Sequence, residues 1–250
     1  MLRIINEIVG YTLLAQDGEI GRCHDFLFDD RSWVVRYMVA KTAKWLPGRK
    51  VVISPVFLEQ PDWVARQFPL RLTREQIEQS PPLDEHAPVS HQYEIDYHQY
   101  YALPYYWAGQ QLWGAYPDPA GVVHPIPTHS TPEVKEVEAK EGHLRSINEV
   151  TGYRIAAVDG DIGHVEDFLI DDETWALRYL VVDTRNWLPG RKVLVSPLWL
   201  ESIRWADKKV YVDLDTESIK NSPEFDPTRP VNRTYETMLY DYYGRPNYWK

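Results

Sequence analysis

Cysteine is almost absent from this chain of 250 residues, because Cys23 is the only one. An intrachain disulfide is therefore excluded, and a chain without disulfides fits a reducing compartment, so we expect a cytoplasmic location. Long apolar segments are also missing, since no run approaches the roughly 18 residues that span a bilayer. The first residues lack a basic segment followed by a small-residue cleavage site, so no signal peptide is expected.

Positive charge is in the minority, with 27 Lys and Arg against 37 Asp and Glu, which gives a net charge of -10. This balance argues against broad non-specific binding to nucleic acid, although it leaves room for a local basic patch. Reactive motifs are missing as well, because the sequence has no nucleophile motif, P-loop or dinucleotide fingerprint. We therefore predict that the protein is not an enzyme and that it has no catalytic residues and no cofactor.

What the sequence does contain is a repeat. A shift of 142 residues superimposes the two halves of the chain without a gap, and 34 of the 62 residues at positions 2–63 are identical to their partners. The motif WLPGRKV occurs unchanged in both copies, and DFLFDD in the first matches DFLIDD in the second. Self-similarity of this kind indicates that one structural unit has been duplicated.

The repeat divides the chain into four parts. We expect one domain at residues 1–80 and a second at 144–222, each followed by a tyrosine-rich tail, the last at 223–250. The first tail lies in a connector, residues 81–143, that holds 9 acidic and only 2 basic side chains. Its Pro-rich and Glu-rich stretches are typical of a flexible linker.

Strand signals dominate each copy. Short alternating segments are separated by turn formers such as Asp-Gly and Pro-Gly, and five or six strands fit into about 80 residues. A small closed barrel would remove the exposed edges of so many short strands. We therefore predict an all-β fold with two tandem small β-barrels, each followed by a short helical tail.

One hairpin in each copy predicts an ion pair. With a four-residue turn at positions 29–32, Asp25 lies opposite Arg36 on the neighbouring strand. The same register in the second copy places Asp167 opposite Arg178. Directly opposed charges of opposite sign stabilise a strand pair by roughly 0.2–1 kcal/mol. The alternative is that each of these charges points to solvent.

The same turns contain adjacent acids, Asp29-Asp30 and Asp171-Asp172. Paired carboxylates can serve acid–base chemistry or bind a hard cation, but a calcium loop needs further oxygen ligands at set spacings. None follow here, so we interpret these acids as turn formers.

The tails carry tyrosines at helical spacing. Positions i, i+4 and i+7 hold Tyr93, Tyr97 and Tyr100 in the first tail, while Tyr235 and Tyr242 mark the second. This spacing forms one stripe on a helix. An isolated helix of about twelve residues is marginal in water, so the stripe is expected to dock on a barrel or on a partner.

The repeated WLPGRK loop is the best candidate for a binding site. An aromatic side chain beside two adjacent cations on a turn can stack on a planar group and hold an anion. The alternative is that the Trp packs on the barrel rim and the cations are solvated. The residues concerned are Trp45, Arg49 and Lys50 in the first copy and Trp187, Arg191 and Lys192 in the second.

Histidines raise the question of a metal site. His91 and His98 are seven residues apart on the first expected tail helix, with His86 nearby, and three converging imidazoles can bind zinc. The second copy has Arg233 and Tyr240 at the positions of His91 and His98. A metal that the fold requires is therefore not expected, and we predict none.

The ordered motifs NExxGY, IGxxxDFLxDD, WxxRY and WLPGRKVxxSP resemble those of the PRC-barrel domain. That family is named from the cytoplasmic part of the photosynthetic reaction centre H subunit, and it is similar to the C-terminal domain of a ribosome maturation factor. The resemblance covers residues 1–80 and 144–222 together with the tails. It implies a six-stranded, barrel-like β domain that binds other macromolecules and does not catalyse reactions.

These observations favour a non-catalytic interaction or adaptor protein whose two PRC-barrel modules pack pseudo-symmetrically. The expected partners are proteins, with barrel–barrel packing within the chain or in a homo-oligomer. One alternative is a factor that binds RNA or the ribosome through the basic loops. Another, which rests on family analogy, is a soluble accessory protein of photosynthetic or electron-transport membranes.

Overall fold

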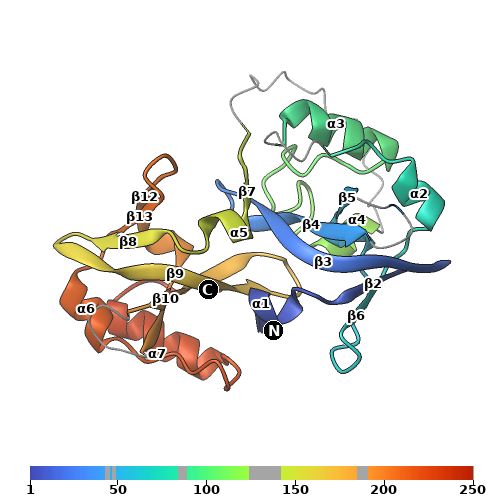
Figure 1. Ribbon diagram of the computed structural model, residues 1–250. Coiled ribbons are helices and arrows are strands. Elements are labelled where there is room, and N and C mark those ends of the chain that lie inside the picture. Colours follow the sequence, from blue (N-terminus) through green and yellow to red (C-terminus); the bar gives the residue numbers. More distant parts are fainter. Residues whose placement is uncertain (43–45, 47–48, 84–88, 124–141, 185–190, 250) are drawn as a thin grey trace. The chain divides into compact units, whose positions relative to one another are not determined.

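The chain divides into two compact units, each built on one β-sheet (Figure 1). Unit 1 comprises Met1–Glu7, Asn148–Asp172 and Leu177–Lys250, and unit 2 comprises Ile8–Ile147 and Glu173–Ala176. This predominantly β architecture agrees with the predicted fold class. The computed structural model describes residues 1–42, 46, 49–83, 89–123, 142–184 and 191–249.

The sheet of unit 2 has the strand order β5-β4-β3-β2-β6, and β7 pairs with β3 outside this path. The strands β2 and β6 are parallel, and the other pairs are antiparallel. The strands are β2 (Thr12–Ala15), β3 (Gly18–Asp29), β4 (Val34–Thr42), β5 (Lys50–Ile53), β6 (Gln67–Pro69) and β7 (Leu144–Ser146).

The sheet of unit 1 repeats this arrangement, with the order β11-β10-β9-β8-β13-β12 and with β1 paired to β9. Here β8 and β13 are the parallel pair. The strands are β1 (Leu2–Ile4), β8 (Arg154–Ala157), β9 (Gly160–Asp171), β10 (Leu177–Asp183), β11 (Lys192–Val195), β12 (Leu200–Arg204) and β13 (Lys209–Val212).

The helices are short, and most of them also recur 142 residues later. Those of the first half are α1 (Ile5–Ile8), the 3-10 turn η1 (Pro55–Phe57), α2 (Arg74–Glu78), α3 (His91–Tyr100) and α4 (Pro119–Val123). Those of the second half are α5 (Ile147–Val150), η2 (Pro197–Trp199), α6 (Thr216–Asn221) and α7 (Arg233–Tyr243). The sequence repeat is therefore also a repeat of elements, although α4 has no counterpart.

The long strands β3 and β9 bend so that each pairs with three other strands. Gly21 sits at the bend of β3, where a Cβ atom would lie 2.2 Å from the carbonyl oxygen of Lys41. Gly163 of β9 would place its Cβ 2.0 Å from the carbonyl oxygen of Asp183. Only glycine allows the backbones to approach this closely, which explains why the Ile-Gly pair occurs in both copies.

The strand β4 is buried on both faces. On one face Tyr37 and Val39 form an apolar cluster with Tyr97 of α3, so the tail helix covers this side of the sheet (Figure 1). On the other face Met38 and Ala40 are completely buried in the core of the unit. In unit 1, α6 and α7 lie along one side of the sheet in the same way (Figure 1).

The first strand of each unit comes from the other half of the sequence, which departs from the predicted contiguous boundaries. In unit 1, β1 pairs with β9, with Leu2 opposite Asp171 and Ile4 opposite Leu169. In unit 2, β7 pairs with β3 in the same register. The two first strands, LRI and LRS, are nearly identical. Local sequence therefore gives no preference for one partner strand over the other, which is why contiguous domains were predicted.

The connector is also more ordered than predicted in the part that the structure describes. Trp113, Tyr116 and Val122 are each less than 8% exposed within unit 2. The indole Nε1 of Trp113 donates to the carbonyl oxygen of Thr174, 2.9 Å away. Aromatic burial of this kind makes residues 108–123 part of the fold of unit 2 instead of a flexible linker.

Candidate functional site

The predicted ion pairs Asp25–Arg36 and Asp167–Arg178 are wrong. The turn between β3 and β4 is displaced, so that Asp29 faces Val34, and β-bulges shift the register further until Asp25 faces Val39. The guanidinium of Arg36 instead lies 3.3 Å from the carboxylate of Asp29.

The second copy shows the same displacement. Arg178 pairs with Asp171 at 3.2 Å, and Asp167 faces Val181. Both turns contain a Trp in the left-handed backbone conformation, with φ of 56° at Trp33 and 60° at Trp175. A large side chain in this conformation is uncommon, so pattern reasoning does not anticipate it. The first acid of each Asp-Asp pair is therefore both a turn former and the partner of a buried or half-buried arginine.

Asp25 and Asp167, which do not lie opposite the predicted arginines, form hydrogen bonds with other segments. Asp25 accepts a hydrogen bond from the hydroxyl of Ser146 on β7, at 2.5 Å. Asp167 accepts from the backbone N–H of Asn6, at 3.3 Å. Burial raises the pKa of Asp167 to about 6, against the opposing effect of its hydrogen bonds from Phe168 and Asn6. Asp25 thus holds β7 in unit 2, and Asp167 holds α1 in unit 1.

The basic loops do not present free cations. Trp45 and Trp187 lie outside the described residues. Arg49 donates to the carbonyl oxygens of Glu78, at 2.8 Å, and Ser80, at 3.0 Å. Glu78 is the last residue of α2 and Ser80 follows it closely, at the end of the helix where unpaired carbonyl groups attract a cation.

The second basic loop repeats this contact. Arg191 donates to the carbonyl oxygen of Ser222, which follows α6. Lys192 pairs with Glu166 at 2.8 Å, and Lys50 of the first loop is half-buried. The arginines of both loops therefore act as clamps on the short helices.

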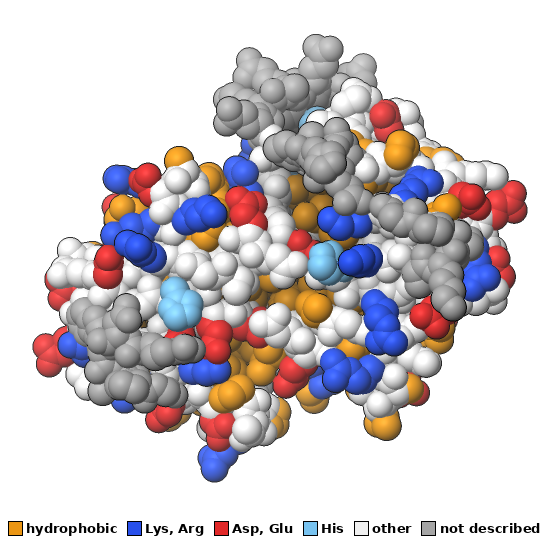
Figure 2. Space-filling view, in the orientation of Figure 1, with side chains coloured by type: hydrophobic (Ala, Val, Ile, Leu, Met, Phe, Trp, Pro, Cys, Tyr) orange, Lys and Arg blue, Asp and Glu red, His pale blue; other side chains and the backbone are white. Residues whose placement is uncertain are grey.

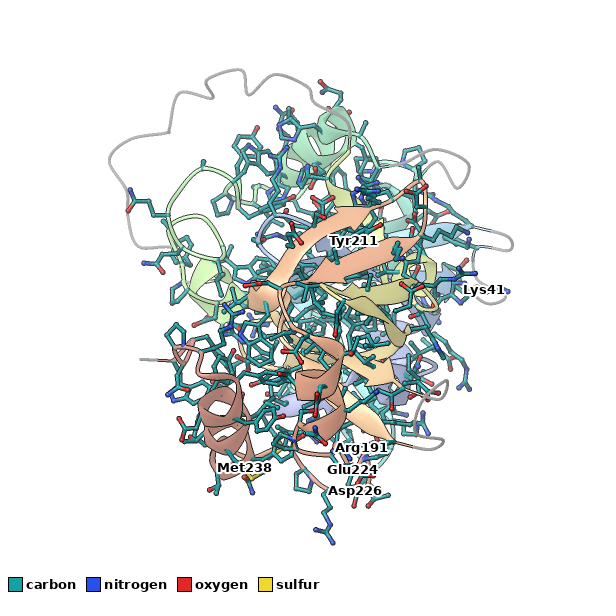
Figure 3. All side chains as sticks on the ribbon, turned by 90° about the vertical axis from the view of Figure 1, so that its left-hand side faces the viewer. Lys41, Arg191, Tyr211, Glu224, Asp226 and Met238 are labelled. Atoms are coloured by element: carbon teal, nitrogen blue, oxygen red, sulfur yellow. The ribbon has the colours of Figure 1, made fainter. Side chains whose placement is uncertain are left out.

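The tyrosine stripes dock on their own unit. Tyr97 is completely buried, and its hydroxyl accepts from the N–H of Ser54, at 3.0 Å, and donates to the carbonyl oxygen of Val52. The other hydroxyls reach backbone carbonyls: Tyr93 to Pro81, Tyr100 to Gln76, Tyr235 to Pro223 and Tyr242 to Ser218. The predicted tail helices are confirmed as α3 and α7, and their tyrosines serve the fold of the unit. By contrast, Met238 of α7 is half exposed and points outward (Figure 3).

A buried glutamate on α3 is the centre of a polar cluster that the sequence did not reveal. Glu94 is completely buried, and it accepts a hydrogen bond from the hydroxyl of Tyr106. The guanidinium of Arg36 lies over the Tyr106 ring, 3.8 Å from its centroid, and donates to the carbonyl oxygen of Leu112 at 2.6 Å. Burial opposes ionisation of Asp29, but Arg36, the N–H of Arg31 and the hydroxyl of Ser32 hold the pKa of Asp29 below its usual range.

Two histidines complete this cluster. The Nδ1 atom of His91 lies 3.7 Å from Oε2 of Glu94, and Nε2 of His143 lies 3.6 Å from the same oxygen. The Nε2 atom of His143 is also 2.9 Å from the hydroxyl of Tyr106. Burial raises the pKa of Glu94 to about 7, and burial lowers the pKa of both histidines. Glu94 is therefore the member of this group whose pKa lies near neutral pH.

Unit 1 holds the corresponding cluster with one decisive difference. Glu236 accepts from the hydroxyls of Tyr179, at 2.9 Å, and Tyr248, at 2.7 Å. Its second oxygen lies 3.0 Å from the guanidinium of Arg233, which occupies the position of His91 in the repeat. A fixed cation thus neutralises the glutamate of unit 1, whereas titratable imidazoles face the glutamate of unit 2.

A surface pocket of about 230 Å³ opens beside the cluster of unit 2. It brings together the β3–β4 turn, α3, the segment after α3 and the residue before β7. The pocket is lined by Asp29, Arg31, Ser32, Arg36, His91, Tyr106, Trp107, Gly109, Gln111 and His143. Of the residues predicted from the basic loops and the tyrosine stripes, none that the structure describes lines this pocket.

A signal for this site was present in the repeat. Glu94 and Glu236 are identical across the two tails, as are the Tyr-Trp pairs that end them, while His91 is exchanged for Arg233. A glutamate retained on the docking face of a helix indicates a buried polar partner. The partner residues lie on other elements, so the sequence did not show which ones would meet.

Metal ligands do not converge in the part of the chain that the structure describes. No group of three or more His, Cys, Asp or Glu side chains there has a geometry that could hold a metal ion. His98 is buried, and its Nδ1 lies 2.9 Å from the carbonyl oxygen of Pro104. Burial lowers the pKa of His98 to about 4. None of the described helices is long and apolar enough to cross a membrane.

Comparison with known families supports the resemblance noted above. Residues 142–219 match the family model of the PRC-barrel domain. The matched segment contains β7 to β13 and α5, and it ends within α6. A search of the curated proteins finds no match.

Proposed function

We propose that the chain is a non-catalytic adaptor built from two PRC-barrel modules, one in each copy of the repeat, acting in the cytoplasm. The match at residues 142–219 supports this assignment for the second copy. For the first copy, the support is the recurrence of its strands and helices at an interval of 142 residues. Domains of this kind act by presenting a surface, so the function depends on which surface is available to a partner.

The observation that carries the proposal is that the groups capable of chemistry are engaged in holding the fold together. Asp29 and Asp171 pair with arginines, Asp25 fixes β7, and Glu236 is neutralised by Arg233. Asp29 lines the pocket of unit 2, but its carboxylate is bonded to Ser32 and Arg36 and so is not free to act as a base. The polar cluster of unit 2 lies beside a pocket of about 230 Å³, and we propose this pocket as the partner-binding surface.

The exchange of first strands supports a pseudo-symmetric pair of modules. Each unit takes its first strand from the other half of the chain, in equivalent registers. The two units would then present unlike surfaces, because among the described residues imidazoles lie next to the buried glutamate of unit 2, whereas Arg233 lies next to that of unit 1.

The alternative of RNA binding through the basic loops loses its main support. Arg49 and Arg191 are bonded to backbone carbonyls, and Lys192 is paired with Glu166. Basic and acidic side chains are both spread over the visible face in Figure 2. A uniform phosphate-binding surface would need cations that are free to release counterions.

Capture of partners by the full chain tests the proposal. Arg31→Glu reverses one charge of the pocket, and the second copy already has a glutamate, Glu173, at the matching position. Arg229→Glu is the matched control, because Arg229 lies in unit 1 and its side chain is 84% exposed. We expect a specific set of proteins to be captured from source-cell extract by the wild type and by the control, and to be lost with Arg31→Glu. Identical capture by all three chains, or recovery of ribosomal RNA by all three, would contradict the proposal.

A further inference from the structure

The pocket of unit 2 contains one cation that the fold does not use. Arg31 stands in the β3–β4 turn and is exposed, and its guanidinium has no hydrogen bond or ion pair with any residue that the structure describes. The other arginine of the pocket, Arg36, is bonded to Asp29, Ser32 and Leu112. Arg31 therefore adds a net positive charge at the mouth of the pocket, where an anion can approach it.

The two imidazoles each keep one ring nitrogen without a hydrogen bond among the described residues. The hydroxyl of Tyr106 donates to Glu94, so its oxygen accepts from Nε2–H of His143. In neutral His143 this leaves Nδ1 as an acceptor. For His91, a proton on Nδ1 faces the carboxylate of Glu94, and Nε2 is then the acceptor. Taking up a proton turns the remaining nitrogen of either ring into a donor.

The wall of the pocket is aromatic. The Trp107 ring stacks with the Tyr105 ring, with 4.8 Å between their centroids and 24° between their planes. The centroids of the Trp107 and His91 rings are 4.7 Å apart, and these two rings meet edge to face. A rigid indole beside cations suits a ligand that combines a charged group with a planar or apolar body.

We propose that this pocket is an oxyanion site, in which Arg31 and the protonated imidazoles of His91 and His143 bind a carboxylate or phosphate group whose apolar body lies against Trp107. The assignment deepens the proposed function, on which it rests for the identity of the partner-binding surface. It names the group that a partner would present there.

Binding at this site takes up a proton. The charged and titratable groups that face the imidazoles are Asp29, Asp30, Arg31, Arg36, Glu94, Tyr106 and the neighbouring His98. Glu94 is buried behind the imidazoles, and its ionised form repels an anion. Protonation of either Glu94 or a histidine raises the charge of the site by one, so an anion binds more tightly as the pH falls.

The repeat supplies the comparison that isolates this effect. In unit 1 the fixed cation Arg233 lies 3.0 Å from Glu236, so no proton is needed to neutralise the glutamate. Changing His91 to the residue of the other copy, His91→Arg, should therefore weaken the pH dependence of anion binding in unit 2, leaving only the part that His143 contributes.

The experiment measures binding of benzoate and phenyl phosphate to the full chain by calorimetry between pH 6 and 8, with benzamide as the uncharged probe. We expect the wild-type affinity to fall roughly tenfold per pH unit if one proton is taken up. Arg31→Glu should lose at least about tenfold at every pH, and the affinity of His91→Arg should fall less steeply with rising pH than that of the wild type. The control Arg229→Glu should match the wild type.

Each result decides one point. Tighter binding of benzoate identifies a carboxylate partner, and tighter binding of phenyl phosphate identifies a phosphate. The inference is overturned if neither anion binds, if benzamide binds equally, or if Arg31→Glu or pH has no effect on the affinity. Loss of protein capture by Arg31→Glu without anion binding would leave the proposed function intact. If anions bind but Arg31→Glu leaves protein capture unchanged, the oxyanion site stands. The pocket is then not the partner-binding surface.

Discussion

At the scale of single residues, the most constrained side chain of unit 2 is Arg36. It is 3% exposed, it pairs with the buried Asp29, and it lies between the rings of Tyr106 and Trp113. A buried guanidinium is tolerated only when its charge and its donors are matched. Arg36 thus joins the β3–β4 turn to the segment after α3, and the shape of the pocket depends on it.

Replacement of this arginine should be costly. Arg36→Ala leaves Asp29 buried without its cation, so we expect unit 2 to lose about 3–5 kcal/mol in free energy of unfolding. The matched variant Arg178→Ala should lose less, because the Arg178 and Asp171 side chains are 20% and 18% exposed. Urea unfolding of the two variants against the wild type makes the comparison, and equal losses would contradict the prediction.

Glu94 predicts a dependence of stability on pH. Burial raises its pKa from 4.5 to about 7, so the folded state keeps a proton that the unfolded chain releases. The associated stability is present at low pH and is lost as the pH rises from about 4.5 through 7. Glu94→Gln cannot titrate but still accepts from Tyr106. Between pH 5 and 8, the wild type should lose about 1–3 kcal/mol relative to this variant.

Urea midpoints of the wild type and Glu94→Gln, measured at each pH unit, test this sign. Glu236→Gln is the contrasting variant, since it deprives Arg233 of its ion pair and should destabilise the chain across the same range. A wild type that gains stability over Glu94→Gln as the pH rises would show that Glu94 is ionised in the folded state.

At the scale of elements, the tail helices were the features best predicted from sequence. The tyrosines at helical spacing indicated both helices, which the structure shows as α3 and α7. Such spacing involves residues a few positions apart, so the sequence contains it. The hairpin pairing of Asp25 with Arg36 failed because bulges and a left-handed Trp33 reset the register. Those features depend on what packs against the strands, which no local pattern shows.

The docking of α3 buries the hydroxyl of Tyr97 completely. Tyr97 satisfies the N–H of Ser54 at the end of β5, where the chain enters η1. Tyr97→Phe leaves this buried N–H without its partner, so we expect a loss of about 1–3 kcal/mol. Hydrogen exchange should localise the change to Ser54 and α3. Tyr235→Phe, whose hydroxyl is half-buried and reaches Pro223, should have a smaller effect, and equal effects would argue against the role of burial.

At the scale of the whole molecule, the sequence repeat predicts that the same elements occur twice. It does not predict which unit each first strand, β1 or β7, joins. The first strands LRI and LRS can each pair with β3 or β9, because the pairing residues of those strands are also alike. The structure assigns each first strand to the unit formed mainly by the other copy. The polar cluster depends on the same assignment of strands. His143 directly precedes β7, and it lies beside Glu94 because β7 pairs with β3 in unit 2.

Deletion of residues 1–7 distinguishes this exchange from contiguous domains. The deletion removes β1, the ion pair of Arg3 with Asp172 and the bond of Asn6 to Asp167, all within unit 1. We expect unit 1 to lose about 2–4 kcal/mol. Hydrogen-exchange protection should fall in β9, at residues 169–171, while residues 27–29 of β3 keep theirs.

A synthetic peptide of residues 1–8 should restore protection in β9, because an open strand edge accepts a strand added in trans. A peptide with the same composition in scrambled order is the control, since it offers the same side chains without the matching register. If the deletion instead exposes residues 27–29 of β3, the first strand pairs within its own copy. The units would then be contiguous, and His143 would have no strand to hold it beside Glu94.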